Sequence, residues 1–246
     1  MRSIEQPELL IVNDETQVRG ALRTSLQASG FEVCETSSRY DALKRIRENE
    51  LDLVLLDVSA RTVDGLDLCR EIRGLGSRIG IIVVTCRDSE KDTVEALEAG
   101  ADDYVIRPFR MRELTARCHA VLRRAVDDSE GEECCITAGD LELNLRSRVL
   151  CKAGKVVRLT PTEYSLLAFM MKNQEVPLTH TKLLRAVWGP EYGAELEYLR
   201  TYVRLLRRKI EHDPAQPQYL LTEPFLGYRF SRPPTPRPTL SAIDHL

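Results

Sequence analysis

Short apolar runs alternate with amphipathic stretches through the first half of the chain. This alternation is the pattern of a parallel sheet whose faces are covered by helices. The predicted strands are Leu9–Val12, Phe31–Cys34, Leu53–Leu56, Ile79–Thr85 and Tyr104–Ile106. The predicted helices are Gln17–Ala28, Tyr40–Glu48, Gly65–Arg73, Glu90–Ala99 and Arg110–Arg124. Runs such as LVLL and IIVV indicate a sheet buried on both faces. We therefore predict a doubly wound α/β domain of five βα units over residues 1–125.

The pattern changes after residue 125. Residues 127–133 (DDSEGEE) are acidic and lack apolar anchors, so we place a linker over residues 126–135. Beyond it, short strands are expected at Leu141–Leu145, Val149–Lys152, Val156–Leu159, Tyr219–Thr222 and Tyr228–Phe230. Helices are expected from Thr160 to about Met171, over Thr179–Trp188 and over Glu195–Glu211. These elements predict an α+β domain over residues 136–232, followed by a proline-rich tail, 233–246, that we expect to be disordered.

The composition is that of a globular protein, with 43% hydrophobic and 30% charged residues. No apolar run approaches the roughly 18 residues that span a bilayer, and the first residues lack the pattern of a signal peptide. We therefore expect a cytoplasmic protein with no membrane partner. The seven cysteines show no CxxC pair with partner histidines, so we interpret them as reduced, mostly buried side chains. Redox sensing is the alternative role for them.

Charge is distributed unevenly between the two halves. Residues 1–134 carry 19 basic and 27 acidic residues, whereas the remainder carries 16 basic and 11 acidic residues. An acidic first half and a basic second half indicate different partners. An anionic polymer such as nucleic acid suits the second half.

Polar groups follow four of the predicted parallel strands. The first strand ends in Asn13-Asp14-Glu15, the third in Asp57 and the fourth in Thr85, and the fifth leads into Arg107-Pro108. Ligands gather beyond the carboxyl ends of such strands. A carboxylate beside Mg²⁺ can attack a phosphoryl group while a hydroxyl and a cation stabilise its oxygens. Acids at strand ends can also serve only as helix caps, but their matching positions favour phosphoryl chemistry.

Several stretches of residues 8–124 resemble the receiver domain of two-component response regulators: LLIVNDE, DLVLLDV, DGLDLCREIR, IIVVTCRD and ALEAGADDYVIRPF. Residues 138–230 resemble the effector domain of the OmpR/PhoB family through LTPTEYSLL, AVWGP and GYRF. The segment from WGPEY to QPQYLLTE is most similar to the potassium-responsive KdpE branch. The resemblance implies a winged helix-turn-helix domain and a transcriptional regulator, with control of potassium transport as the expected role.

The resemblance also implies roles for single residues. Asp57 would accept a phosphoryl group from a sensor histidine kinase, assisted by Thr85 and Arg107. Thr85 and Tyr104 would be the switch pair that reports the phosphate to the face formed by the fourth helix, fifth strand and fifth helix. The expected Mg²⁺ ligands are Asn13, Asp14, Asp57 and the backbone carbonyl of Ser59.

The sequence departs from the family pattern at three positions. Asn13 replaces a second acid, which should lower Mg²⁺ affinity, and Arg107 replaces the usual lysine. Thr93 replaces a basic residue of the expected homodimer face. The remaining charges of that face match the family: Asp102, Asp103, Glu113, Arg117 and Arg124. The departures favour an alternative in which the regulator depends weakly, or not at all, on phosphorylation.

The last predicted helix carries the expected DNA-reading surface. Leu199, Val203, Leu206 and Ile210 form an apolar stripe, and the arginines lie on another face. By resemblance, the residues that contact promoter DNA are Arg200, Thr201, Arg204, Leu205 and Arg208, with Trp188 and Thr222 flanking its backbone. In the wing, Pro224 weakens the case for minor-groove reading, and Phe225 is expected to pack within the domain. Contact with sugars or RNA polymerase is the alternative for Phe225.

Two other functions compete with this interpretation. A nucleotide-binding enzyme is disfavoured because no GxGxxG or GxxxxGK[ST] loop follows the first strand. Asp57-Val58-Ser59 lacks the second acid of a dedicated aspartyl phosphatase, so we do not expect an enzyme. An interaction protein without specific DNA binding is the second rival. The absence of a salt-sensitive DNA complex would identify it.

Overall fold

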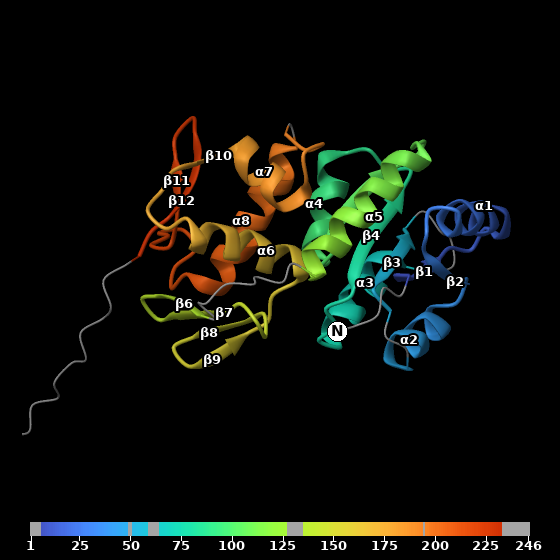
Figure 1. The fold of residues 1–246 in the computed structure, drawn as a ribbon, viewed down its shortest axis with the longest axis horizontal. Coiled ribbons are helices and arrows are strands. Elements are labelled where there is room, and N and C mark those ends of the chain that lie inside the picture. The colour runs from blue at the N-terminus through green and yellow to red at the C-terminus, as the bar shows by residue number, and fades with distance from the viewer. Residues whose placement is uncertain (1–5, 49–50, 59–63, 127–134, 194, 233–246) are drawn as a thin grey trace, which may run out of the picture.

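The computed structural model describes residues 6–48, 51–58, 64–126, 135–193 and 195–232. Its first domain is a five-stranded parallel sheet in the order β2-β1-β3-β4-β5 (Figure 1). The strands are β1 (Glu8–Val12), β2 (Glu32–Thr36), β3 (Leu53–Asp57), β4 (Gly80–Thr85) and β5 (Asp103–Ile106). The helices are α1 (Thr16–Gln27), α2 (Arg39–Glu48), α3 (Gly65–Gly74), α4 (Glu90–Glu98) and α5 (Met111–Val126).

Strands β3 and β4 are buried along their whole length because helices cover both faces of the sheet. On β3, Val54 and Leu56 belong to one hydrophobic core, whereas Leu53 and Leu55 belong to another on the opposite face. Alternate residues of a strand point to opposite faces, so a strand with two buried faces must be apolar throughout. The predicted doubly wound fold is therefore confirmed.

The second domain joins two small antiparallel sheets to three helices. The first sheet contains β6 (Cys135–Ala138), β7 (Leu141–Asn144), β8 (Val149–Lys152) and β9 (Lys155–Val157). The second contains β10 (Leu178–Thr179), β11 (Leu220–Glu223) and β12 (Gly227–Phe230), and the β11–β12 hairpin forms the wing. The helices are α6 (Pro161–Lys172), α7 (His180–Trp188) and α8 (Leu196–Ile210). This is the winged-helix arrangement that we predicted.

Local chemistry explains where α6 begins. The Thr160 hydroxyl accepts from the Glu163 N–H, and the Glu163 carboxylate accepts from the Thr160 N–H at 2.8 Å. With Pro161 at the first helical position, this capping box was readable from the sequence. Its geometry fixes the N-terminus of α6 at the boundary between the two domains.

The sequence missed two strands and misplaced some ends. β6 is a short, largely exposed edge strand beside the acidic segment, and β10 has only two residues, so neither shows an apolar pattern. β9 ends at Val157 rather than Leu159. The linker prediction falls largely on residues 127–134, and these and the predicted tail, 233–246, lie outside the described residues.

The two domains are packed against each other. One hydrophobic core continues from the first domain into the second, and α8 packs on α4 while α6 and α7 pack on α5 (Figure 1). The cysteines that the structure describes form no disulfide. No helix among the described residues is both long and apolar enough to span a membrane.

Candidate functional sites

Asp57 lies at the carboxyl end of β3 with only 4% of its surface exposed. Its Oδ2 accepts a hydrogen bond from Nη2 of Arg107 at 2.5 Å. Arg107 follows β5 and is joined to Pro108 by a cis peptide bond. The structure therefore brings the two residues together across β4, as their positions at the carboxyl ends of parallel strands predict, and the guanidinium neutralises the carboxylate in a largely buried site.

Asn13, buried at the end of β1, also donates to Oδ2 of Asp57 through its Nδ2. Its Oδ1 accepts from the Glu15 N–H at 2.6 Å. These two contacts fix the orientation of the amide, because only the nitrogen can donate and only the oxygen can accept. The Asn13 oxygen therefore faces the backbone rather than Asp57.

This orientation bears on how the site fits Mg²⁺. The carboxylates of Asp14 and Asp57 suit the ion, which takes one or two carboxylates and keeps several waters. Asn13 adds no oxygen beside Asp57, and Ser59 lies outside the described residues. Within the described ranges, no group of three His, Cys, Asp or Glu side chains is arranged to hold a metal. The donor set therefore fits a Mg²⁺ ion held mainly by water.

The predicted switch pair lies beside this pocket. Thr85 is fully buried, and its Oγ1 accepts from the Arg87 N–H at 3.1 Å. The Tyr104 hydroxyl donates to the Arg87 carbonyl at 2.6 Å, and the Thr85 and Thr93 hydroxyls interact with it. Burial raises the pKa of the Tyr104 phenol, with Asp92 adding to the effect. The Tyr104 ring is thus buried close to Thr85.

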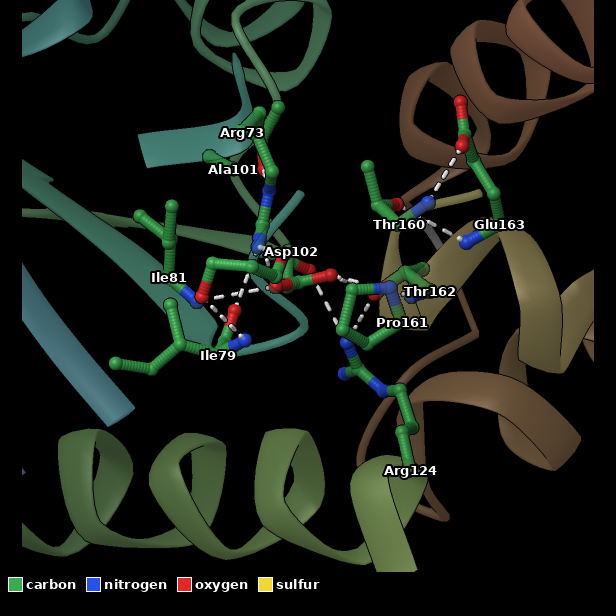
Figure 2. Close-up of polar contacts among 12 residues, drawn as sticks. Arg73, Ile79, Ile81, Ala101, Asp102, Arg124, Thr160, Pro161, Thr162 and Glu163 are labelled. Atoms are coloured by element: carbon green, nitrogen blue, oxygen red, sulfur yellow. Dashed lines mark hydrogen bonds and ion pairs between the residues drawn. The ribbon is translucent and has the colours of Figure 1, made fainter. Parts of the chain in front are cut away.

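Four of the five residues expected on the homodimer face contact the second domain within this chain: Asp102, Asp103, Arg117 and Arg124. Asp102 has no exposed surface, and its Oδ1 accepts from the Thr162 N–H at 3.1 Å and the Thr162 Oγ1 at 2.8 Å (Figure 2). Its Oδ2 accepts from Arg73 at 2.6 Å and from the Ile81 N–H at 3.0 Å. Asp102 is thus held from both domains, with its charge paired to Arg73.

Arg124 reaches the same place from α5. Its Nη1 donates to Oγ1 of Thr162 at 2.9 Å and to the Asp102 carbonyl at 3.1 Å (Figure 2). Its Nε donates to the Val187 carbonyl at 2.9 Å. The guanidinium lies 5.6 Å from the ring centre of Trp188. Arg124 therefore contacts both α6 and α7.

Asp103 makes a parallel set of contacts. It accepts from Arg117 at 3.1 Å through Oδ1 and from the Tyr192 hydroxyl at 2.5 Å through Oδ2. Burial, followed by the Asp103 charge, raises the pKa of Tyr192, which keeps its hydroxyl a donor. Arg117 also bonds to Glu113 at 3.0 Å along α5.

The DNA-reading helix shows its predicted stripe and a partly occupied basic face. Leu199, Val203, Leu206 and Ile210 are buried. Arg200, Arg204 and Arg208 are exposed, but Arg204 and Arg208 both pair with Glu98 of α4, at 3.1 and 3.3 Å. Thr222 is exposed and Leu205 is half-buried, whereas Thr201 and Trp188 are buried. In this arrangement Trp188 is a core residue packed on Tyr202.

Sequence reasoning missed two tyrosines of α8. The Tyr198 hydroxyl donates to the Tyr104 carbonyl at 2.9 Å, and the Tyr202 hydroxyl donates to the Ala101 carbonyl at 2.6 Å. Both tyrosines sit beside the apolar stripe, so their spacing indicates core packing. Nothing in that spacing shows that their hydroxyls reach another domain.

The wing also differs from the prediction. Phe225 was expected to pack within the domain, but its side chain is fully exposed, with a relative exposure of 107%. It lies at the tip of the hairpin, where the Leu226 N–H bonds to the Glu223 carbonyl. Its positive φ of 62° belongs to the tight turn that directs the ring outward.

Comparisons with known proteins cover both domains. The family described as response regulator receiver domain matches residues 9–119, and the family described as transcriptional regulatory protein, C terminal, matches residues 154–230. The transcriptional regulatory protein KdpE of Mycobacterium tuberculosis is 39% identical over 90% of this chain and 98% of its own. The KDP operon transcriptional regulatory protein KdpE of Escherichia coli is 38% identical over the same shares. A solved structure of a RitR C128D mutant has a TM-score of 0.76 and 24% identity, covering 91% of this chain and 98% of its own, and so supports the fold.

Proposed function

The chain belongs to the OmpR/PhoB family of two-component response regulators with a DNA-binding effector domain, and from this premise we propose that phosphorylation of Asp57 controls binding of α8 to promoter DNA. The observation that carries the proposal is the buried Asp57 carboxylate at the carboxyl edge of the sheet, in contact with Arg107 and close to the Thr85 end of β4. The relatives of this chain are transcriptional regulators rather than enzymes.

Each group of the pocket has a defined part in this chemistry. An Asp57 oxygen attacks the phosphorus of a phosphohistidine in a sensor kinase, and the histidine nitrogen leaves. Arg107 is placed to move from the carboxylate to the phosphoryl oxygens, which a guanidinium can bind with two parallel hydrogen bonds. The Thr85 hydroxyl donates to another of these oxygens. Mg²⁺ held by Asp14 and Asp57 would neutralise charge on the phosphoryl group.

The second domain supplies the output. Arg200, Arg204 and Arg208 form the basic face of α8, which fits the major groove, while Leu205, Thr201 and Thr222 border it. Because Trp188 is buried, we assign it to supporting α8 rather than to contacting the DNA backbone.

The phosphorylated chain binds DNA as a dimer through α4, β5 and α5 in the cytoplasm. By likeness to the two KdpE proteins, we propose a potassium-transport operon as the target. The fully exposed Phe225 is a candidate contact for RNA polymerase.

A weakly phosphate-dependent regulator is the second candidate. It is favoured because Asn13 and Arg107 both donate hydrogen bonds to Oδ2 of Asp57. The Arg107 guanidinium thereby neutralises the Asp57 carboxylate without a phosphoryl group or a metal ion.

One experiment separates the two. Wild type and Asp57→Ala are compared in DNA binding with and without acetyl phosphate and Mg²⁺, while mass spectrometry records the phosphoryl adduct. An Asp57 adduct together with phosphodonor-dependent DNA binding supports the first candidate. Equal DNA binding by both proteins, with no adduct, supports the second.

A further inference from the structure

A cavity of about 310 Å³ lies at the boundary between the two domains, beside the end of α5. Its walls come from α5, α6, α7 and the turn between β7 and β8. Four of its lining residues are basic: Arg123, Arg124, Arg148 and Lys172. The rest of the lining is largely apolar, and none of the described residues in it is acidic. A cavity lined in this way favours an anionic ligand.

Arg124 is a buried cation that forms no ion pair with any described residue. Only 4% of its surface is exposed. Its Nε and Nη1 donate to the Val187 carbonyl, the Asp102 carbonyl and the Thr162 hydroxyl, and none of these acceptors carries a charge. Its Nη2 is buried and has no hydrogen-bond partner among the residues that the structure describes. A buried charge and a buried donor are both costly without partners. An anion in the cavity would supply a counter-charge and an acceptor.

Two exposed cations border the same cavity. Arg123 lies in the last turn of α5, and Lys172 is the last residue of α6. Neither side chain pairs with a carboxylate of another described residue. The helix macrodipole attracts cations to the end of a helix, and this explains each of the two residues singly. It does not explain why two helices contribute cations to one cavity, or why Nη2 of Arg124 lacks a partner.

The charge and the size of the cavity suit a small phosphate ester. Guanidinium groups bind phosphate oxygens with two parallel hydrogen bonds. Three cations without a carboxylate partner match a phosphate dianion better than they match a single carboxylate. The volume is near the lower end of the roughly 300–1,000 Å³ that is typical of ligand pockets. Phe169 and Tyr164 line the cavity and offer an apolar wall for a small organic group.

We propose that this cavity binds a small phosphomonoester, with its phosphate held by Arg123, Arg124 and Lys172 and its organic group against Phe169. The Arg148 guanidinium lies over the Tyr164 ring, 4.5 Å from its centre, and holds that wall in place. Because the ligand contacts α5 of the receiver and α6 of the effector domain together, its binding should raise the thermal stability of the chain.

The proposed site is separate from the Asp57 pocket. Asp57 lies at the carboxyl edge of the receiver sheet, and α5 begins at this edge after β5. The 16 residues of α5 then carry the chain about 24 Å away before Arg123 and Arg124 line the cavity. The phosphomonoester site therefore depends neither on Asp57 nor on DNA, and it goes beyond the function proposed above.

The chain contains its own probe for this site. Trp188 is its single tryptophan and is fully buried, with the Arg124 guanidinium 5.6 Å from its ring centre. An anion bound to Arg124 changes the electric field at the indole, so tryptophan emission should change and reach saturation as ligand is added. The wild-type full chain is titrated in EDTA with inorganic phosphate and with phenyl phosphate, and calorimetry gives both dissociation constants. Sodium chloride at equal ionic strength controls for screening. Phenyl phosphate should bind more tightly than inorganic phosphate.

The test variant combines Arg123→Gln with Lys172→Gln, which removes two exposed charges of the lining. The matched control combines Lys182→Gln with Arg185→Gln, which removes the same charges from exposed positions of α7 outside the lining. The test variant should bind phenyl phosphate at least about tenfold more weakly than wild type, because it loses two charge-assisted contacts. The control should bind as wild type does.

Three results would contradict the proposal. The absence of both a saturable emission change and a heat of binding in wild type, with either compound, would overturn the site. Equal weakening in the test variant and the control would show a general effect of charge and would also overturn it. Equal affinity for the two compounds would overturn the ester and leave inorganic phosphate as the ligand. None of these measurements involves DNA or the Asp57 adduct, so a failure here is distinct from a failure of the proposed function.

Discussion

Thr162 of the effector domain donates both its N–H and its hydroxyl to the Asp102 carboxylate of the receiver, at 3.1 and 2.8 Å (Figure 2). The same carboxylate forms an ion pair with Arg73 at 2.6 Å, and neither side chain is more than slightly exposed. Asp102 therefore forms a buried ion pair within the receiver and also links the receiver to the effector domain.

Asp102→Ala should reduce the free energy of unfolding by about 3 kcal/mol or more, because removing one partner of a buried pair leaves the other charge unpaired. Arg73 would lose its carboxylate in a largely buried position. Urea denaturation followed by circular dichroism measures the loss. Asp67→Ala is the control, since Asp67 pairs with Arg70 at an exposed site where such pairs contribute up to about 1 kcal/mol. Equal losses in the two variants would contradict a special role for Asp102.

Asn13→Asp should increase Mg²⁺ affinity, by about tenfold if the new carboxylate binds the ion. The native amide directs its nitrogen to Asp57 and its oxygen to the Glu15 N–H, so it adds no negative charge to the site. Isothermal titration calorimetry with Mg²⁺ measures the change. Gln27→Glu, which adds the same charge at the exposed last residue of α1, controls for net charge. An Asn13→Asp protein with native Mg²⁺ affinity would show that residue 13 does not contact the ion.

The five βα units were predictable because a strand buried on both faces must be apolar at every position. β3 and β4 meet this condition up to their last residues, Asp57 and Thr85, and were placed to within one residue. β6 and β10 were not predictable for the opposite reason. Each strand is short and partly exposed, so too few of its positions must be apolar to give a recognisable hydrophobic pattern.

The sequence also predicted that Asn13 and Arg107 lie near Asp57, because parallel strands bring their carboxyl ends to one edge. It could not predict the Asn13 amide orientation, which depends on a local bond to Glu15. Nor could it predict the contact between Asp102 and Thr162, 60 residues apart. From the sequence, Thr162 is recognisable only as a residue in the first turn of a capped helix. Its role depends on the fit of two folded surfaces, and periodicity within one helix contains no information about that fit.

The pH dependence of stability should contain a contribution from Cys69. Desolvation by burial raises the pKa of its thiol from 9.0 to about 12 in the folded protein. Between these two pKa values the native state keeps a proton that the unfolded chain releases. The free energy of unfolding is therefore unaffected by this thiol below pH 9 and falls as the pH rises towards 12. In Cys69→Ala, the fall of the free energy of unfolding with pH in this interval should be smaller by about 1.4 kcal/mol per pH unit. Urea titrations between pH 8 and pH 11 provide the measurement, with exposed Cys86→Ala as control. Parallel curves for wild type and Cys69→Ala would contradict the assignment.

Arg204→Ala should weaken promoter binding severalfold and reduce the dependence of log affinity on log salt by about one unit, if Arg204 contacts a phosphate. The same substitution removes one of the two arginines that pair with Glu98 of α4, so it also weakens the packing of α8 on the receiver. Loss of a phosphate contact lowers DNA affinity, whereas loss of the pair with Glu98 makes α8 easier to reach, so the affinity of this variant alone does not identify the phosphate contact. Measurements are therefore made in a Glu98→Gln background, which lacks the carboxylate that pairs with Arg204 and Arg208, by fluorescence anisotropy at several salt concentrations. Arg39→Ala is the control, because Arg39 pairs with Glu71 within the receiver. An unchanged slope and unchanged affinity of Arg204→Ala in this background would assign Arg204 to the contact with α4 alone.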